Sequence, residues 1–325
     1  MNPAGVTERL TAEQSLEAAE LLAAGCTVAI PTETVYGLAA DAADDAAVAK
    51  IFAAKGRPAG HPLIVHVESF EAVGDWADVS DPRVALLADQ FWPGPLTLIL
   101  PRTDRVSLLV VGDRQTVGVR VPDHPVARAV LEAFAQVGSG GVAAPSANRF
   151  GHVSPTTASH VLDDLDGRID AVIDGGDSRV GVESTIVELV AGQVPTLLRP
   201  GGVSIGEIED ALGESVVDGR SGESRAAGML ASHYAPSASV AVVASLEGVH
   251  VDEYVAVVGP VDAQAVGGSP AVVLELSAEA GAFAAALYTS LRAADALGVK
   301  RIVVVPPTHG SLLGAVLDRL QKAAA

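Results

Sequence analysis

The sequence predicts an α/β protein with a large twisted mixed sheet and a second, smaller α/β domain. Short apolar runs typical of buried strands alternate with segments of helical periodicity along the chain. Polar segments rich in Lys, Arg, His, Ser, Thr and Asn follow several of these runs, where the loops of α/β proteins bind ligands. The 325 residues, 49% of them hydrophobic, are enough for two cores.

The first part of the chain contains most of the predicted strands. Helical periodicity covers residues 13–24 and 44–54, and buried-strand runs cover 27–30 and 62–67, so we expect a β-α-β start. Further strands are expected at 96–100, 118–121, 142–144, 171–173, 184–190 and 196–198. Further helices are expected at 82–90, 125–136, 156–162 and 205–212.

A polar segment divides the chain. Residues 213–237 are rich in Gly, Ser, Arg and Ala and show little periodicity, which is typical of a linker. After it, strands are expected at 240–244, 255–258, 271–274 and 301–305, and helices at 283–296 and 310–323. The predicted organisation is therefore a first domain over 1–212, a linker or lid over 213–237 and a smaller Rossmann-like domain over 238–325.

Charge and composition narrow the function. The formal net charge of −19 argues against wrapping nucleic acid, so any contact with tRNA should be weak or indirect. A single cysteine, Cys26, allows no internal disulfide, and no apolar stretch reaches the roughly 20 residues that span a bilayer. We expect a cytoplasmic protein without a membrane segment.

Two loops combine cations and small polar groups. Lys55-Gly-Arg57-Pro58 follows a predicted helix, and Gly56 allows both cations to face one anionic site. Pro145-Ser-Ala-Asn148 follows a predicted strand. Taken singly, each loop also fits a solvated helix end or an ordinary turn.

Three further residues are candidates for the same cleft. Thr34 lies at the exit of the first predicted strand, where a simple helix cap is the alternative. His66 alternates with apolar neighbours, so a hydrogen-bonded core histidine is equally consistent with the pattern. Arg120, in a short apolar strand, requires an anion or several acceptors.

Several familiar motifs are missing from the sequence. It has no Gly-x4-Gly-Lys-Ser/Thr loop, no Gly-x-Gly-x-x-Gly before a helix and no His-Glu-x-x-His. What remains is a cationic, hydroxyl-rich cleft suited to phosphates and a carboxylate, without an obvious protein nucleophile.

The ordered motifs resemble those of the L-threonylcarbamoyladenylate synthases. They are Pro31-Thr-Glu-Thr-Val-Tyr-Gly37, Lys55-x-Arg57-Pro58, Pro62-Leu-Ile64, Trp92-Pro-Gly-Pro-Leu-Thr97, Arg120-Val-Pro122, Pro145-Ser-Ala-Asn148, Glu183-Ser-Thr185 and Arg199-Pro-Gly201. Ser232-His-Tyr-Ala-Pro236 and the segment Leu287-Tyr-x-x-Leu-Arg-x-x-Asp295 further resemble the long, two-domain form. The resemblance implies a YrdC-like catalytic domain with helices around a concave cleft.

The resemblance also implies a reaction. L-threonine, bicarbonate or CO₂, and ATP with Mg²⁺ would give threonylcarbamoyl-AMP and pyrophosphate. A separate tRNA threonylcarbamoyltransferase would then modify adenosine 37 of tRNAs that read ANN codons. No metal ligand is assigned to a protein side chain.

The family's site residues carry over to matching positions. The threonine site would comprise Thr34, His66, Arg120, the backbone of Ala144, and Ser184. The ATP site would comprise Lys55, Arg57, His61, Thr116, Ser146, Asn148, Ser154, Arg199 and Tyr234. Catalytic roles would fall to Lys55, Arg57, Ser146 and Asn148. His61 departs from the small polar residue expected there, which would make its contact sensitive to pH.

Two alternatives to a synthase remain at this stage: an RNA-binding or nucleotide-sensing module of the same fold, and a carbamoyl-transfer domain like those of hydrogenase maturation proteins. The acylphosphatase and zinc segments of the latter are missing from this sequence. We also hypothesise that residues 215–236 close over the bound nucleotide through Tyr234, the alternative being a passive tether.

Overall fold

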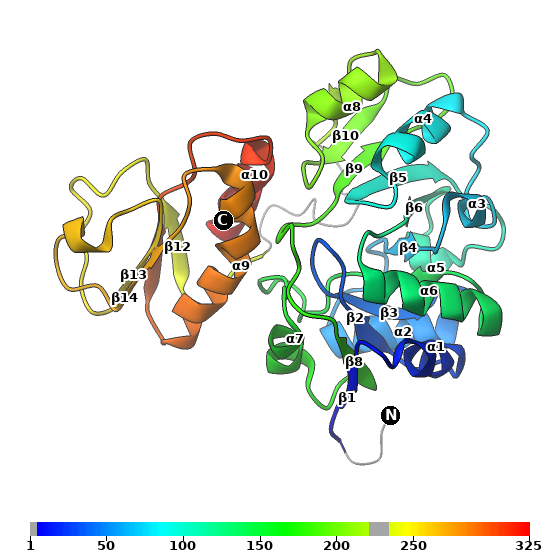
Figure 1. Ribbon diagram of the computed structural model, residues 1–325, viewed down its shortest axis with the longest axis horizontal. Helices are drawn as coiled ribbons and strands as arrows, with labels where there is room; N and C mark the ends of the chain where they lie inside the picture. Colours follow the sequence, from blue (N-terminus) through cyan, green and yellow to red (C-terminus); the bar gives the residue numbers. More distant parts are fainter. Residues whose placement is uncertain (1–4, 221–233) are drawn as a thin grey trace.

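The computed structural model describes residues 5–220 and 234–325. Two bodies lie side by side, a larger one built on an eleven-stranded sheet and a smaller one built on a four-stranded sheet (Figure 1). Both parts are therefore α/β, as the sequence predicts. Residues 221–233, the middle of the predicted linker, lie outside the described residues. In the described residues, every helix is too short or too polar to cross a membrane.

The large sheet mixes parallel and antiparallel pairs. Its spatial order is β1 (Glu8–Thr11), β8 (Ala171–Asp174), β2 (Val28–Ile30), β3 (Gly37–Asp41), β7 (Val142–Ala143), β4 (Ile64–His66), β6 (Thr116–Arg120), β5 (Leu96–Pro101), β9 (Thr185–Glu188), β10 (Thr196–Arg199) and β11 (Val217–Asp218). For example, β2 is parallel to β8 and antiparallel to β3. The short strand β11 extends this sheet beyond residue 212, where we placed the end of the first domain.

The expected β-α-β start is wrong. Strand β3 forms an antiparallel pair with β2, and β3 and β7 separate β2 from β4 in the sheet. The sequence Gly-Leu-Ala-Ala-Asp of β3 lacks the β-branched and aromatic residues that favour strands, so local preference does not reveal it. Burial of its first four residues, Gly37 to Ala40, supplies the stabilisation instead.

Helices cover both faces of the large sheet. Those of at least eight residues are α1 (Ser15–Ala23), α2 (Asp45–Lys55), α4 (Pro82–Phe91), α6 (Pro125–Val137), α7 (Ala158–Leu165) and α8 (Ile205–Leu212). Two single-turn helices were not predicted from the sequence, α3 (Phe70–Val73) and α5 (Leu108–Val111). Most of the longer helices begin at a side-chain cap, such as the Ser204–Glu207 capping box of α8.

Two apolar cores lie on opposite faces of this sheet. Leu38 and Ala40 of β3 join one core with α2 and α4, whereas Ala39 joins the other core with α1 and α6. Successive residues of a strand point to opposite faces, so a single strand supports both layers. This packing fixes the strand ends from which the cleft is built.

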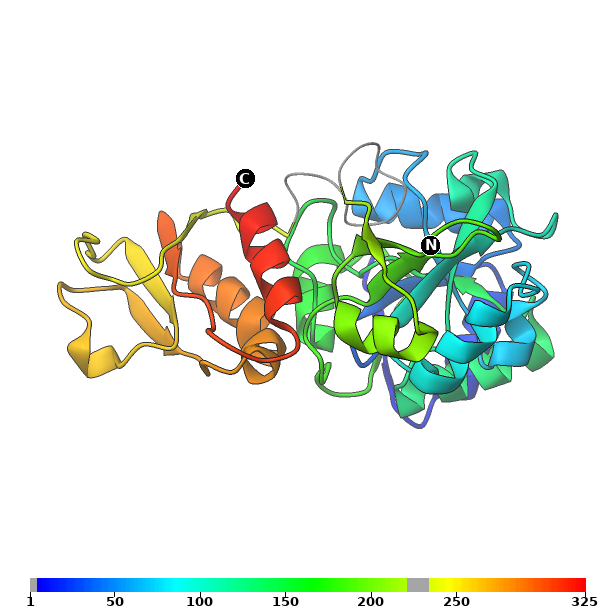
Figure 2. The same cartoon turned by 90° about the horizontal axis from the view of Figure 1, so that it is seen from above.

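The second domain has an entirely parallel sheet. Its order is β12 (Ser239–Val242), β15 (Arg301–Val304), β13 (Val255–Gly259) and β14 (Val272–Glu275). The remaining elements are the 3₁₀ turn η1 (Ala263–Ala265) and the helices α9 (Ala280–Ala296) and α10 (Leu313–Ala323). Figures 1 and 2 both place α9 and α10 between the small sheet and the first domain.

One apolar cluster joins the two domains. Val35, Val153 and Val182 of the first domain belong to the same buried cluster as Phe283 and Leu287 of α9. At Gly181, which has φ +76°, an added Cβ would lie 2.3 Å from the carbonyl oxygen of Ala284, so the loop touches the backbone of α9. The two domains therefore share part of their core.

Candidate functional site

A narrow cleft of about 50 Å³ lies beside the ends of β4 and β6. Because β4 and β6 are parallel neighbours with His66 opposite Arg120, both side chains reach the same edge of the sheet. All five residues predicted for threonine line this cleft, as do four of those predicted for ATP. They are Thr34, His66, Arg120, Ala144 and Ser184 in the first set, and Arg57, Ser146, Arg199 and Tyr234 in the second.

The loop before β3 brings an acidic and a hydroxyl side chain to Arg120. The Oγ1 of Thr32 accepts hydrogen bonds from the backbone N–H groups of Thr34 and Val35, which holds the loop in a tight turn. Arg120 donates from Nη2 to Oε1 of Glu33 at 2.6 Å and to Oγ1 of Thr34 at 3.0 Å. The guanidinium thus has the anion and the acceptors that its burial requires.

His66 is buried and neutral in this setting. Its Nδ1 lies 3.2 Å from the carbonyl oxygen of Ile64, which fits a donating Nδ1–H and leaves Nε2 as an acceptor. Burial and the nearby charge of Arg120 lower the pKa of His66 to about 3. At neutral pH it contributes a polar contact and no second positive charge.

Lys55 lies beneath the cleft and holds its loop. Its Nζ donates to the backbone oxygens of Ser146 and Asn148, both at 2.5 Å, and the side chain is buried. Burial, then the charge of Arg57, lowers its pKa well below the ordinary lysine value. Lys55 does not line the cleft, so in this arrangement it shapes the loop 146–148.

Arg57 faces the cleft directly. It donates from Nη2 to the carbonyl oxygen of Pro62 at 3.2 Å, and its guanidinium lies 5.7 Å from the ring centre of Phe150. Among the described residues, its buried Nε has no hydrogen-bond partner. Burial lowers the pKa of Arg57 to about 10, so the group is still charged at neutral pH. A buried cation with an unused donor is suited to an anionic ligand.

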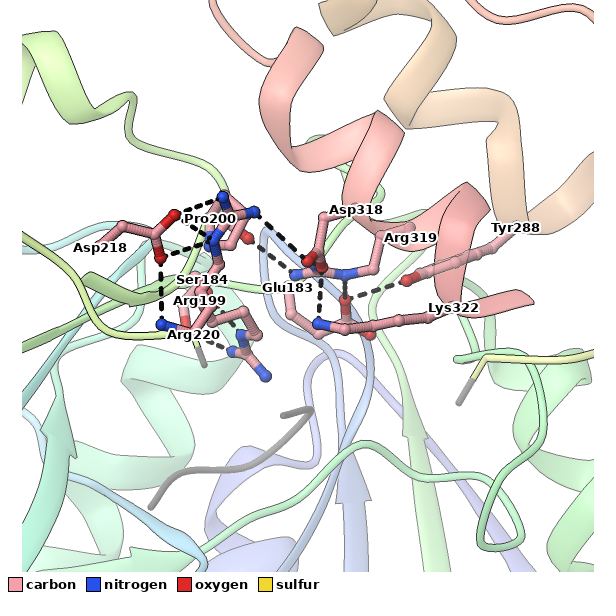
Figure 3. Close-up of polar contacts among 10 residues, drawn as sticks. All are labelled: Glu183, Ser184, Arg199, Pro200, Asp218, Arg220, Tyr288, Asp318, Arg319 and Lys322. Atoms are coloured by element: carbon pink, nitrogen blue, oxygen red, sulfur yellow. Dashed lines mark hydrogen bonds and ion pairs between the residues drawn. The ribbon is translucent and has the colours of Figure 1, made fainter. Parts of the chain in front are cut away.

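Ser184 and Arg199 form a second pair in the cleft wall. Arg199 donates from Nε to the carbonyl oxygen of Ser184 and from Nη2 to its Oγ, both at 3.0 Å (Figure 3). The Oγ of Ser184 also lies 2.8 Å from Oγ1 of Thr97 on β5. Ser184 therefore has a fixed orientation toward the cleft.

Tyr234 enters the cleft from the far end of the linker. Its ring is buried and stacks on Tyr288 of α9 with 6.0 Å between ring centres, while the Arg319 guanidinium of α10 lies 5.1 Å from its centre. Tyr234 has φ +63°, an uncommon backbone conformation for a tyrosine. The second domain thus holds the part of the linker that reaches the site. The rest of the hypothesised lid lies mainly outside the described residues.

The remaining predicted residues do not line the cleft. Asn148 donates to the carbonyl oxygens of Arg149 and His152, and Ser154 donates to Glu183. Thr116 begins β6, and the ring of His61 lies 5.6 Å from that of Phe150, with its pKa lowered by burial and by Arg57 and Arg114. Thr116 is at the opposite end of β6 from Arg120, and the contacts of all four residues with ligands stay predictions.

Four further residues line the cleft that were not predicted from the sequence: Val35, Ile64, Pro145 and Glu183. Glu183 accepts hydrogen bonds from Ser154 at 2.5 Å, Tyr288 at 3.0 Å and Arg319 at 2.7 Å. Burial alone raises the pKa of Glu183, but the charges of Arg319 and Arg199 and the hydrogen bonds from Ser154 and Arg319 outweigh it and lower the pKa to about 2. Glu183 is therefore ionised. Arg319 could have been found from the sequence, because a charged residue at the helical spacing of Val316 and Ala323 lies on the apolar face of α10 and needs a buried partner.

Metal ligands are a separate question. In the ranges 5–220 and 234–325 there is no group of three His, Cys, Asp or Glu side chains placed to hold a metal ion. The two carboxylates nearest the cleft cations, Glu33 and Glu183, are each engaged by an arginine.

The chain is similar to known proteins along nearly its whole length. The family described as Telomere recombination, which groups Sua5, YciO and YrdC, matches residues 20–201. The family described as Threonylcarbamoyl-AMP synthase, C-terminal domain, matches residues 203–325.

Individual relatives agree with this. A threonylcarbamoyl-AMP synthase from Bacillus subtilis is 40% identical over 98% of this chain and 96% of its own, and one from Pyrococcus abyssi is 46% identical over 73% of this chain and 70% of its own. The crystal structure of P. abyssi Sua5 complexed with L-threonine superposes with a TM-score of 0.88 at 38% identity, covering 98% of this chain and 97% of that one. These names favour a synthase over an RNA-binding or nucleotide-sensing module. The chain belongs to the threonylcarbamoyl-AMP synthase family, in the form that joins the catalytic domain to a second, C-terminal domain.

Proposed function

We propose that the cleft makes threonylcarbamoyl-AMP and pyrophosphate from L-threonine, bicarbonate or CO₂, and ATP. The observation that carries the proposal is the presence of two buried arginines with different surroundings in one cleft. Arg120 is joined to Glu33 and Thr34, whereas Arg57 keeps an unused donor. Such a cleft provides separate places for a carboxylate and for a polyphosphate.

The threonine site would lie between β4, β6 and the loop before β3. The contacts of Arg120 use Nε and Nη2, so Nη1 is the nitrogen that a carboxylate would meet. The same space is lined by the hydroxyls of Thr34 and Ser184 and by the neutral ring of His66. These groups can form hydrogen bonds with the amine and the hydroxyl of threonine. The L-threonine complex of P. abyssi Sua5, which has the same fold, supports this choice of amino acid.

The reaction needs little covalent help from the protein. The amine of threonine adds to CO₂ and loses a proton, which gives a carbamate. A carbamate oxygen then forms a bond to the α-phosphorus of ATP. The bond between the α-phosphorus and the oxygen that bridges it to the β-phosphorus breaks, and its electron pair leaves with pyrophosphate. Arg57 and Arg199 would neutralise phosphate charge, and the loop held by Lys55 would position the reactants.

Magnesium enters this proposal with ATP. Because Glu33 and Glu183 are already paired with arginines, the phosphates themselves are the natural ligands for the ion. When bound, Mg²⁺ would neutralise the pyrophosphate that leaves. The product would pass in the cytoplasm to a tRNA threonylcarbamoyltransferase, because an acyl adenylate is short-lived in water.

Pyrophosphate release tests the proposal. We expect release that requires threonine and bicarbonate together. Serine should be a poorer substrate, because one missing methyl group in a fitted pocket costs about 1–3 kcal/mol. Equal release without any amino acid would rule out the proposed reaction.

A further inference from the structure

Helix α10 of the second domain reaches the wall of the cleft through Arg319. The side chain is almost fully buried and donates from Nε to Oε2 of Glu183 at 2.7 Å and from Nη2 to the carbonyl oxygen of Pro200 at 3.0 Å (Figure 3). Its Nη1 donates to Asp318 at 2.5 Å. All three nitrogens of one guanidinium are therefore in use.

The two segments joined by Arg319 both carry cleft residues. Glu183 is next to the cleft residue Ser184, and Pro200 is next to the cleft residue Arg199. Arg199 also donates two hydrogen bonds to Ser184, which links the two segments directly. Gly201 lies against the same segment, because an added Cβ there would come within 2.3 Å of the carbonyl oxygen of Glu183. A change in either segment would therefore move the Ser184–Arg199 pair.

The second domain also forms the seat of Tyr234. The ring of Tyr234 contacts Tyr288 and the guanidinium of Arg319, and Tyr288 donates to the same Glu183 oxygen that Arg319 binds. Helices α9 and α10 thus hold three parts of the cleft wall together: Glu183, the Ser184–Arg199 pair and Tyr234. A lysine in place of Arg319 has one nitrogen and cannot repeat these directions.

We propose that Arg319 is a positioning residue through which the second domain sets the geometry of the substrate cleft. This inference rests on the proposed function, since the groups that Arg319 orders are those assigned to threonine and ATP. Asp318 supports it by accepting hydrogen bonds from Arg319 and from Lys322, the latter at 2.8 Å. Without this support the guanidinium would be free to turn away from Pro200.

The test compares substitutions that keep or remove the fork of nitrogens. Arg319→Lys keeps the charge and loses the geometry. Because breaking a buried pair also destabilises the protein, the double variant Arg319→Met, Glu183→Gln removes both charges together and keeps the fold testable. For each full-length protein, calorimetric titration gives the affinity for ATP and for L-threonine, pyrophosphate release gives KM and kcat, and thermal unfolding gives stability.

We expect Arg319→Lys to weaken ATP binding by about 10- to 100-fold, the range expected for one charge-assisted hydrogen bond, with thermal unfolding still cooperative. The double variant should be more stable than Arg319→Lys, but its affinity for ATP should stay as low. Wild-type ATP and threonine affinity in Arg319→Lys, or full affinity in the double variant, would overturn the proposal. Calorimetry reports on the cleft without turnover, so a wild-type protein that binds both ligands and releases no pyrophosphate would contradict the proposed function alone.

Arg292→Lys is the matched control. Arg292 of α9 also joins the domains, donating to Asp164 at 2.8 Å and to the carbonyl oxygens of Val153 and, at 3.4 Å, Ser154. None of these three residues lines the cleft, and Arg292 meets Ser154 only through its backbone, so the Ser154 hydroxyl stays on Glu183. Arg292→Lys should lower thermal stability while leaving ligand affinity within about twofold of wild type. An equal loss of affinity in Arg292→Lys and Arg319→Lys would mean that any weakening of domain contact has this effect, and the specific role of Arg319 would be wrong.

Discussion

Arg120 and Glu33 form a buried ion pair in the wall of the cleft, with 2.6 Å between Nη2 and Oε1. The pair fixes the guanidinium before any ligand arrives. It also means that the cation assigned to the threonine carboxylate already has a counter-charge, so its effect on the ligand depends on orientation as much as on net charge. Each of the two residues has a distinct expected phenotype.

Replacing Arg120 by Ala should weaken threonine binding by at least tenfold and destabilise the protein by about 3–5 kcal/mol, because Glu33 then stays buried without a partner. Adding Glu33→Gln should restore much of the stability and little of the affinity. Calorimetry and urea unfolding separate the two effects. Arg179→Ala, which removes an exposed pair with Asp123, should change stability by about 0–1 kcal/mol. Restored threonine binding in the double variant would contradict this assignment.

Replacing Arg57 by Ala should weaken ATP binding and leave threonine binding nearly unchanged. Arg57 has few protein acceptors, so its loss removes a ligand contact more than a structural one; one charge-assisted hydrogen bond amounts to about 1.5–3 kcal/mol. Titration of ATP and of threonine into the same variant measures the difference. Arg9→Ala, at an exposed pair with Asp174, serves as control. Equal losses for both ligands would remove the division of roles between Arg57 and Arg120.

Replacing Lys55 by Met should have a different profile, with stability and ATP affinity falling together. The ammonium holds the carbonyl oxygens of Ser146 and Asn148, and a thioether leaves both without that donor. Unsatisfied buried groups cost about 1–3 kcal/mol each. Thermal unfolding and ATP titration on Lys55→Met and Arg57→Ala, side by side, check the contrast. A Lys55→Met protein with wild-type stability and no ATP binding would show instead that Lys55 acts directly on the nucleotide.

The pH dependence of His66 has a definite sign. Its pKa is lowered from 6.5 to about 3 on folding. As the pH falls below 6.5, His66 therefore binds a proton in the unfolded chain but stays neutral in the folded protein. Stability should therefore fall with acidification between about pH 6.5 and 3, by up to about 1.4 kcal/mol per pH unit. His66→Gln should lose this part of the slope in urea unfolding. Threonine affinity should show no titration of His66 between pH 6 and 8, and an apparent pKa near 6.5 that vanishes in His66→Gln would refute a neutral ring.

Much of the fold was predictable because its segments are long or strongly periodic. Helix α8 has the predicted bounds, 205–212, and the strands β4 and β6 lie where their apolar runs predict them. Strand β3 was not predictable, because its Gly and Ala residues have weak local preference and are buried by the tertiary structure.

The cleft was predictable to a similar degree. Motifs at strand ends located its walls, and nine predicted residues line it. The role of Lys55 beneath its loop and the contribution of Arg319 depend on contacts between segments more than 90 residues apart in the sequence, which no local pattern contains.

Gly201 gives the most local test of how the cleft wall is held. An added Cβ would lie 2.3 Å from the carbonyl oxygen of Glu183, the carbonyl carbon of Ser184 and the N–H of Thr185, all of them backbone atoms that cannot rotate away. Gly201→Ala must therefore push the Arg199 turn off the Ser184 segment, and we expect weaker threonine and ATP binding together with a loss of about 1–3 kcal/mol in stability. Gly206→Ala, inside α8 with nothing within 4 Å, should be neutral or stabilising by about 0.4–1 kcal/mol. If Gly201→Ala binds both ligands like wild type, the spacing between these two segments does not set the geometry of the cleft.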